Sequence, residues 1–224
     1  MKKYINAVKL YMQAAVNPLT VIFMLTMLGG MVLAFTIDPD RIGDEDYLSM
    51  LGSVQTAHIG LFLFMLFGGT KIQQSKFYIS CGCGKELLTA ASVIALTCLS
   101  LTYDVAIAIV AAIRLGGAEF SDVVLVNSFS TVLMVYAGSC YAKKGLALGF
   151  SLPYLGVLIS SMLLGKGVIV ETTFGISPFK AVAAAAVIYI LGVTAAVVTS
   201  RIWWKRCDRC TMPDVFSQTI TGGK

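Results

Sequence analysis

Long uninterrupted apolar segments are the feature that most restricts how this chain folds. Six of them recur along the sequence, each of about 20 residues, the length that a helix needs to cross a hydrocarbon layer about 30 Å thick. Charged residues make up 13% of the 224 residues and hydrophobic residues 57%, whereas an ordinary soluble domain has about 25% charged residues. We therefore expect an all-α integral membrane protein with six transmembrane helices, at 18–37, 50–69, 87–113, 123–142, 145–164 and 179–200.

The distribution of charge along the chain predicts its orientation, because loops on the cytoplasmic side retain Lys and Arg. With both termini inside, Arg41, Arg114, Lys166 and Lys180 are the basic residues left on the outer side, together with most of the acidic residues. Trp203 and Trp204 beside a basic cluster predict an anchor at the inner interface. The basic residues then expected on the cytoplasmic side are Lys2, Lys3, Lys9, Lys71, Lys76, Lys85, Lys143, Lys144, Arg201, Lys205, Arg206, Arg209 and Lys224.

The segment before the first predicted span, 1–17, has the pattern of an amphipathic helix. Polar residues recur every three or four positions at Lys2, Asn6, Lys9, Gln13 and Asn17. Apolar residues occupy the opposite face, which predicts a helix that lies in the membrane interface. The alternative is a frayed cytoplasmic extension of the first span. The apolar face is formed by Ile5, Val8, Met12, Ala15 and Val16.

The inner loop 70–86 is much longer than a simple connection between two spans requires. Its first half is expected to form a short amphipathic helix, in which Ile72, Phe77 and Ile79 alternate with polar residues. Cys81-Gly82-Cys83-Gly84 then interrupts that helix before Lys85 begins the next one. A short helix with exposed aromatic side chains, held between two spans, is suited to docking into a groove on a cytoplasmic protein.

In this arrangement the chain resembles the permease subunits of type-2 ABC transporters, most of which are exporters. The resemblance covers nearly the whole chain as architecture, and in sequence it rests on Lys76-Phe77-Tyr78-Ile79-Ser80, a small-residue turn and Lys85. The Cys-Gly-Cys-Gly turn stands where those permeases often have a proline turn. The resemblance implies that loop 70–86 couples the chain to an ATPase subunit. The residues implied in coupling are Lys71, Ile72, Gln74, Lys76, Phe77, Tyr78, Ser80, Lys85 and Glu86.

The sequence has no phosphate-binding loop of the Gly-x-x-x-x-Gly-Lys-Ser/Thr type. We therefore expect a transport subunit rather than an enzyme, with no cofactor bound by this chain and with ATP and Mg bound by a separate ATPase. The resemblance further implies a bacterial cytoplasmic membrane protein with domains 1–17, 18–202 and a cytoplasmic tail 203–224. Its expected partners are the ATPase subunit, a second copy of the chain and membrane lipids, without nucleic acid.

Asp104 is the carboxylate that lies well inside a predicted span, and an ionisable group in hydrocarbon is costly enough to indicate function. His58 on the preceding span is expected at a similar depth, about 12 to 15 Å from the outer ends. One hypothesis is that His58 and Asp104 pair and close the outer half of a pathway. The alternative is that each is satisfied separately by backbone or tyrosine groups. The other residues expected to line this pathway or gate are Gln55, Thr56, Tyr103 and Asn127.

Two further patterns have weaker functional interpretations. Cys81 with Cys83, and Cys207 with Cys210, both face the predicted cytoplasm, but their spacing favours reduced or palmitoylated thiols over a zinc site. Small residues on the fifth and sixth spans allow close helix packing, more often within a subunit than between subunits. Those residues are Gly145, Gly149, Ala181, Ala185, Gly192 and Ala196.

The leading functional hypothesis is the membrane subunit of an ABC exporter that moves a hydrophobic or amphipathic peptide. Export of a lipid or a small drug-like molecule is an alternative cargo. A competing class is a self-contained channel or secondary transporter that uses Asp104 and His58. A third class, a membrane-anchored scaffold or immunity protein, predicts that Asp104→Ala has no effect.

Overall fold

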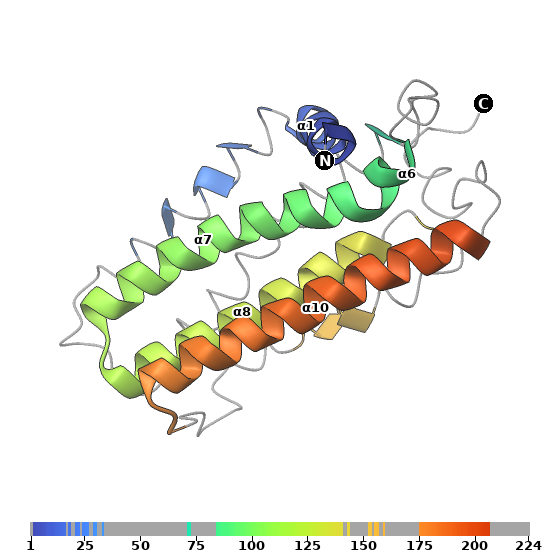
Figure 1. The fold of residues 1–224 in the computed structure, drawn as a ribbon. Coiled ribbons are helices and arrows are strands. Elements are labelled where there is room, and N and C mark those ends of the chain that lie inside the picture. The colour runs from blue at the N-terminus through green and yellow to red at the C-terminus, as the bar shows by residue number, and fades with distance from the viewer. Residues whose placement is uncertain are drawn as a thin grey trace.

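The computed structural model describes residues 2–16, 71–72, 84–140, 143 and 175–206, with runs of one to three residues between 18 and 33 and between 152 and 159. Every regular element within these residues is helical, and they contain no strand. The elements are α1 (Lys2–Ala15), α6 (Gly84–Glu86), the π-helical turn η2 (Leu87–Ala91), α7 (Ser92–Arg114), α8 (Gly117–Cys140) and α10 (Pro178–Arg206) (Figure 1).

Three of the described helices are long and apolar enough to cross a membrane: Gly84–Arg114, Gly117–Cys140 and Pro178–Lys205. They lie over the predicted spans 87–113, 123–142 and 179–200. The other predicted spans, 18–37, 50–69 and 145–164, fall largely outside the described residues.

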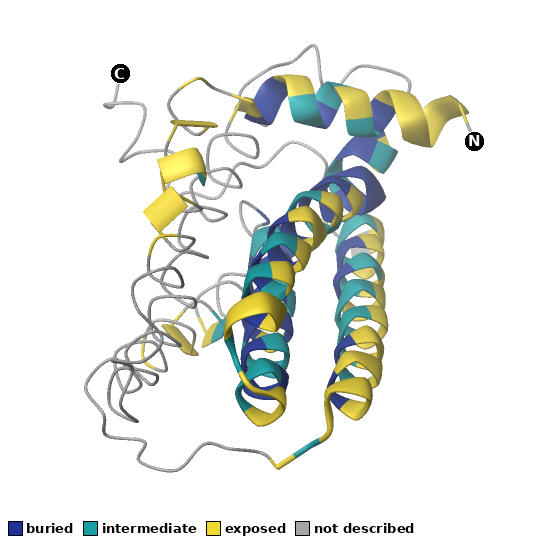
Figure 2. Cartoon of the chain, turned by 90° about the vertical axis from the view of Figure 1, so that its left-hand side faces the viewer, coloured by how far each residue is buried: buried dark blue, intermediate teal, exposed yellow. Residues whose placement is uncertain are grey.

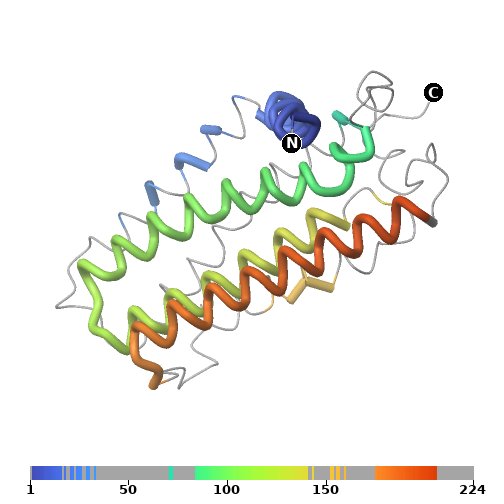
Figure 3. Tube along the Cα trace, viewed as in Figure 1, coloured from blue at the N-terminus to red at the C-terminus, as the bar shows by residue number. Residues whose placement is uncertain are grey.

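A tight connection joins α7 to α8. The amide of Leu115 donates to the carbonyl of Ala111 at 2.8 Å and closes the last turn of α7. The Glu119 carboxylate then accepts a hydrogen bond from the amide of Gly116 at 2.7 Å. This contact is the reciprocal half of a capping box and places a negative charge at the positive end of the α8 dipole. The two helices consequently run antiparallel as a hairpin (Figure 3).

Helices α8 and α10 lie side by side and run in the same direction. At their first residues, the position of a Gly117 Cβ is 3.5 Å from the Pro178 ring. Near the other end, the hydroxyls of Tyr136 and Thr199 are 3.4 Å apart. Pro178 begins α10 at the position where its fixed φ and missing N–H are tolerated.

Helix α1 crosses the end of the bundle at which α7 begins, roughly perpendicular to the long helices (Figures 1 and 2). Its buried residues Ala7, Tyr11, Ala14 and Ala15 share one apolar cluster with residues of η2, α7, α8 and α10. We call this end of the bundle the α1 end. The opposite end holds Arg114, the start of α8 and the start of α10.

Candidate functional site

A buried polar cluster joins α7 to α8 in the middle of both helices. The Asn127 side-chain amide donates to Asp104 Oδ1 at 2.8 Å. The Thr131 hydroxyl donates to the same oxygen at 2.9 Å. The exposed fractions are 8% for Asp104, 2% for Asn127 and 0% for Thr131. A carboxyl group buried in an apolar helix pair requires such donors, because an unsatisfied polar atom there is costly.

Helix periodicity brings these side chains together. Asn127 and Thr131 are four residues apart, so they lie one above the other on the same face of α8. Ser100 and Ile107 flank Asp104 on the buried face of α7, and Ser100 bonds to its own helix through the carbonyl of Leu96 at 2.7 Å. The cluster is therefore a set of direct polar contacts between the buried faces of α7 and α8.

The structure brings together some of the residues predicted for the pathway or gate. Asp104 and Asn127 are in direct contact, and Tyr103 is buried next to Asp104 along α7. Gln55, Thr56 and His58 lie outside the described residues, so the hypothesis of a His58–Asp104 pair stays a prediction. Thr131 was not predicted as a site residue, although it lies four residues after Asn127 and a helix therefore places both on one face.

A second polar cluster surrounds Lys143 at the α1 end. The ammonium donates to the carbonyl of Ser139 and, at 2.6 Å, to the hydroxyl of Ser200. It also lies 5.8 Å from the centre of the Trp203 ring, within range of a cation–π interaction. Burial lowers the pKa of Lys143 to about 8, and the nearby Cys140 thiol opposes that shift. The side chain thus links the end of α8 to α10.

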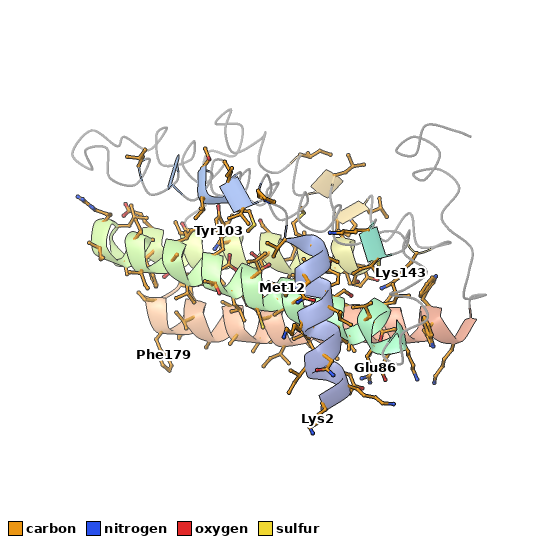
Figure 4. All side chains as sticks on the ribbon, turned by 90° about the horizontal axis from the view of Figure 1, so that it is seen from above. Lys2, Met12, Glu86, Tyr103, Lys143 and Phe179 are labelled. Atoms are coloured by element: carbon orange, nitrogen blue, oxygen red, sulfur yellow. The ribbon has the colours of Figure 1, made fainter. Side chains whose placement is uncertain are left out.

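A third group of residues lies at the base of the predicted coupling loop. Ile72 is 1% exposed and belongs to the same apolar cluster as Tyr11 of α1 and Leu87 of η2. Burial in this cluster raises the pKa of the Tyr11 phenol. Lys71 and Lys85 are exposed beside it. Figure 4 shows Glu86 and Lys143 toward the same end of the bundle, with Phe179 toward the other.

The remaining residues predicted to contact an ATPase are Gln74, Lys76, Phe77, Tyr78 and Ser80, and they lie outside the described residues. The same holds for the cysteine pairs Cys81 with Cys83 and Cys207 with Cys210. Among the residues that the structure describes, no group of three or more His, Cys, Asp or Glu side chains is placed to hold a metal ion.

Comparison with known proteins finds no family model, no curated protein and no solved structure with a significant match to this chain.

Proposed function

We propose that this chain is the transmembrane permease subunit of an ATP-driven ABC exporter. Two copies would form the translocation pathway and bind separate ATPase subunits, in a bacterial cytoplasmic membrane with both termini inside. The observation that carries the proposal is the apolar cluster that joins Ile72, at the start of loop 70–86, to α1 and to the turn at which α7 begins. A force applied to the loop would be passed to both elements through this cluster.

Chain connectivity supports the six-span topology. Ala15 and Ile72 are both in the apolar cluster at the α1 end, which is what two proposed spans between them would produce. Cys140 and Pro178 lie at opposite ends of the bundle because α8 and α10 are parallel. Opposite ends for these two residues are what the proposed fifth span at 145–164 would produce.

The charges at the two ends of the described helices support the orientation. The opposite end carries Arg114, Lys180, Glu119 and Asp122. Because cytoplasmic segments are enriched in Lys and Arg, the α1 end is assigned to the cytoplasm. The basic residues at the α1 end are Lys2, Lys3, Lys9, Lys71, Lys85, Lys143, Arg201, Lys205 and Arg206.

The cargo proposed is a hydrophobic or amphipathic peptide. Helices α7 and α8 contain no Lys, Arg or His before the last turn of α7, and α10 contains none between Lys180 and Arg201. A pathway along these helices would offer few charges to a small hydrophilic ion. An apolar lining favours a cargo that itself buries apolar surface.

The test is to purify the chain with candidate ATPase subunits, reconstitute the complex in liposomes and measure ATP hydrolysis with and without an amphipathic peptide. We expect peptide-stimulated hydrolysis that Phe77→Ala abolishes, since its aromatic side chain is the proposed docking group. Lys180→Ala, at the opposite end, serves as the matched control and should retain stimulation. Transport by the isolated chain at full rate without nucleotide would contradict the proposal.

A self-contained secondary transporter is the second candidate, and the polar cluster at Asp104 is the observation that favours it. A buried carboxylate within a span is a common element of ion and proton pathways. This candidate predicts that an ion or pH gradient alone drives solute uptake into liposomes and that Asp104→Asn abolishes it. The exporter predicts that ATP is required under the same conditions.

A further inference from the structure

Positive charge gathers where α8 and α10 end, and these two helices carry no acidic residue there. Helix α10 contains no Asp or Glu in its 29 residues. The acidic residues of α8, Glu119 and Asp122, lie in its first two turns, at the opposite end of the bundle. The basic side chains described at this end of the two helices are Lys143, Arg201 and Lys205. Their charge therefore has no counter-charge on α8 or α10.

Lys143 contributes a buried positive charge. Its ammonium donates to the Ser139 carbonyl and the Ser200 hydroxyl and lies 5.8 Å from the centre of the Trp203 ring. These partners are neutral, and no carboxylate of the described residues, Glu86 included, forms an ion pair with it. The side chain is charged at neutral pH, because its pKa is about 8. Since water and salt screen a buried charge less than an exposed one, Lys143 attracts an anion to the surface beside it.

The exposed face of α10 at this end combines basic and apolar side chains. Four exposed residues with spacings of three or four positions lie together on this face: Val198, Arg201, Ile202 and Lys205. The exposed fraction is 48% for Val198 and 46% for Ile202. The face therefore suits an amphipathic anion that has a charged head and an apolar chain.

The two tryptophans of the chain lie between this face and Lys143. Trp204 follows Arg201 by three residues and Ser200 by four, so it is a neighbour of both on the helix surface. The ring centres of Trp203 and Trp204 are 6.4 Å apart. Tryptophan is enriched at the headgroup level of a membrane. The basic side chains at this end are thus at the level of the lipid phosphates.

We propose that an anionic phospholipid binds at this end of α10, with its phosphate at Arg201 and Lys205. Its acyl chain lies along Val198 and Ile202. Basic residues next to a span attract anionic lipids, and the charge of Lys143 adds to this attraction without direct contact. A free phosphate ion would use only the basic part of the face, whereas a lipid uses both parts. The inference rests on the chain crossing a membrane and not on the proposed ATPase or cargo.

Tryptophan fluorescence tests the site, because both tryptophans of the chain lie there. The purified chain, without an ATPase, is reconstituted in phosphatidylcholine vesicles. The vesicles contain increasing fractions of phosphatidylglycerol or phosphatidylcholine that is brominated near the headgroup and quenches nearby tryptophans. We expect the anionic lipid to quench at a lower fraction than the neutral one, by about fivefold for each basic side chain at the phosphate. The ratio of the two quenching curves cancels differences in brightness between variants.

Arg201→Gln and Lys205→Gln should each reduce the preference for the anionic lipid about fivefold, and the double variant should remove most of it. Both side chains are exposed, so these variants should fold. Lys180→Gln, at the opposite end of the same helix, is the matched control and should keep the preference. Lys143→Met should weaken it by less than either exposed variant, because the Lys143 charge acts from a distance.

Three results would overturn the inference. The first is equal quenching by the two brominated lipids in the wild-type chain. The emission change caused by an oligoglutamate peptide in neutral vesicles would then show whether the surface binds an acidic protein segment instead. The second is a preference that the double variant retains. The third is a preference that inorganic phosphate removes more effectively than chloride at equal ionic strength, since the ligand is then a free phosphate.

Discussion

Lys143 is the residue whose environment is most unlike that expected from sequence. It was placed among the cytoplasmic basic residues, and a lysine in such a loop is usually exposed. In the structure it is 6% exposed, and its ammonium is bonded to Ser139 and Ser200. Its bond to the Ser139 carbonyl satisfies one of the last carbonyl groups of α8, which have no partner within the helix.

The buried position of Lys143 predicts a pH dependence of stability. Its pKa falls from 10.5 to about 8 in the folded chain, so between these values the unfolded state binds more protons than the folded state. Stability should therefore rise as pH increases from about 8 to about 10.5, by at most about 1.4 kcal/mol per pH unit. Lys143→Met should remove this slope in thermal unfolding measured across that range.

Lys205→Met is the control for this prediction, because Lys205 is exposed on α10. Its unfolding profile should keep the wild-type dependence on pH. If stability still rises with pH in Lys143→Met but no longer rises in Lys205→Met, Lys143 is not the group that causes the pH dependence.

Asp104 and Asn127, the central residues of the polar cluster, were predicted as site residues, but the hydrogen bonds between them and Thr131 were not. Asp104 was identified because a carboxylate inside an apolar span is rare, and Asn127 because it is polar at a similar depth. Which donors contact which oxygen depends on the rotation of α7 against α8. Polar and apolar residues of α8 are not separated onto two faces, so the sequence leaves that rotation undetermined. Thr131 was not identified, because a threonine in a predicted span does not stand out as a carboxylate does.

Among the elements, α1 differs most from its prediction. Of the predicted apolar face, Ala15 is buried in the cluster and Val8 and Met12 pack against it. Ala7, Tyr11 and Ala14 pack against the bundle, whereas Ile5 and Val16, from the predicted apolar face, are exposed. Ala7, Tyr11 and Ala14 do not form an obvious hydrophobic stripe in the sequence, which explains why these three contacts were not predicted.

The packing of α1 leads to a prediction about neighbouring elements. Ala14→Glu would bury a charge in the shared apolar cluster and should detach α1. Because Ile72 and Leu87 lie in that cluster, hydrogen exchange should accelerate at 71–72 and 87–91 as well as in α1. Gln13→Glu adds the same charge on the exposed neighbouring position and should leave exchange unchanged. Faster exchange confined to α1 would show that the cluster does not connect these elements.

The contact between α8 and α10 depends on a glycine. A Cβ built on Gly192 would overlap the Cγ1 methyl of Val132 and lie 3.1 Å from its Cβ. Ala181, Ala185 and Ala196, which share this face of α10, are also buried. Gly192 therefore serves packing within one chain. Small residues in spans were expected to serve packing within a subunit more often than packing between subunits.

Gly192→Ala should destabilise the chain by about 1 to 3 kcal/mol, the usual cost of overpacking a tight interface. Val132→Ala removes the clashing methyl groups, so the double variant should recover part of that loss. The measurement is the unfolding free energy of the two single variants and the double variant in one detergent. Additive losses in the double variant would indicate that the two residues do not meet.

For the whole molecule, the assignment of the α1 end to the cytoplasm predicts which positions share a compartment. In a cysteine-free background, single cysteines at Lys2 and Lys205 should react with a membrane-impermeant thiol reagent only after the cytoplasmic face is opened. A cysteine at Glu119 should react in intact cells. Labelling of Lys2 and Glu119 from the same side would contradict the six-span topology.

The turn η2, between Glu86 and Ser92, is wider than the α-helical turns on either side of it. Such a turn holds one residue more than an α-helical turn, and it is often found where helices serve a function. If η2 tightened into a regular helix, Glu86 and the loop before it would rotate by about 100° relative to Asp104. Under the proposed coupling, a pull on the loop from the cytoplasm would rotate α7, and the extra residue in η2 would allow that rotation.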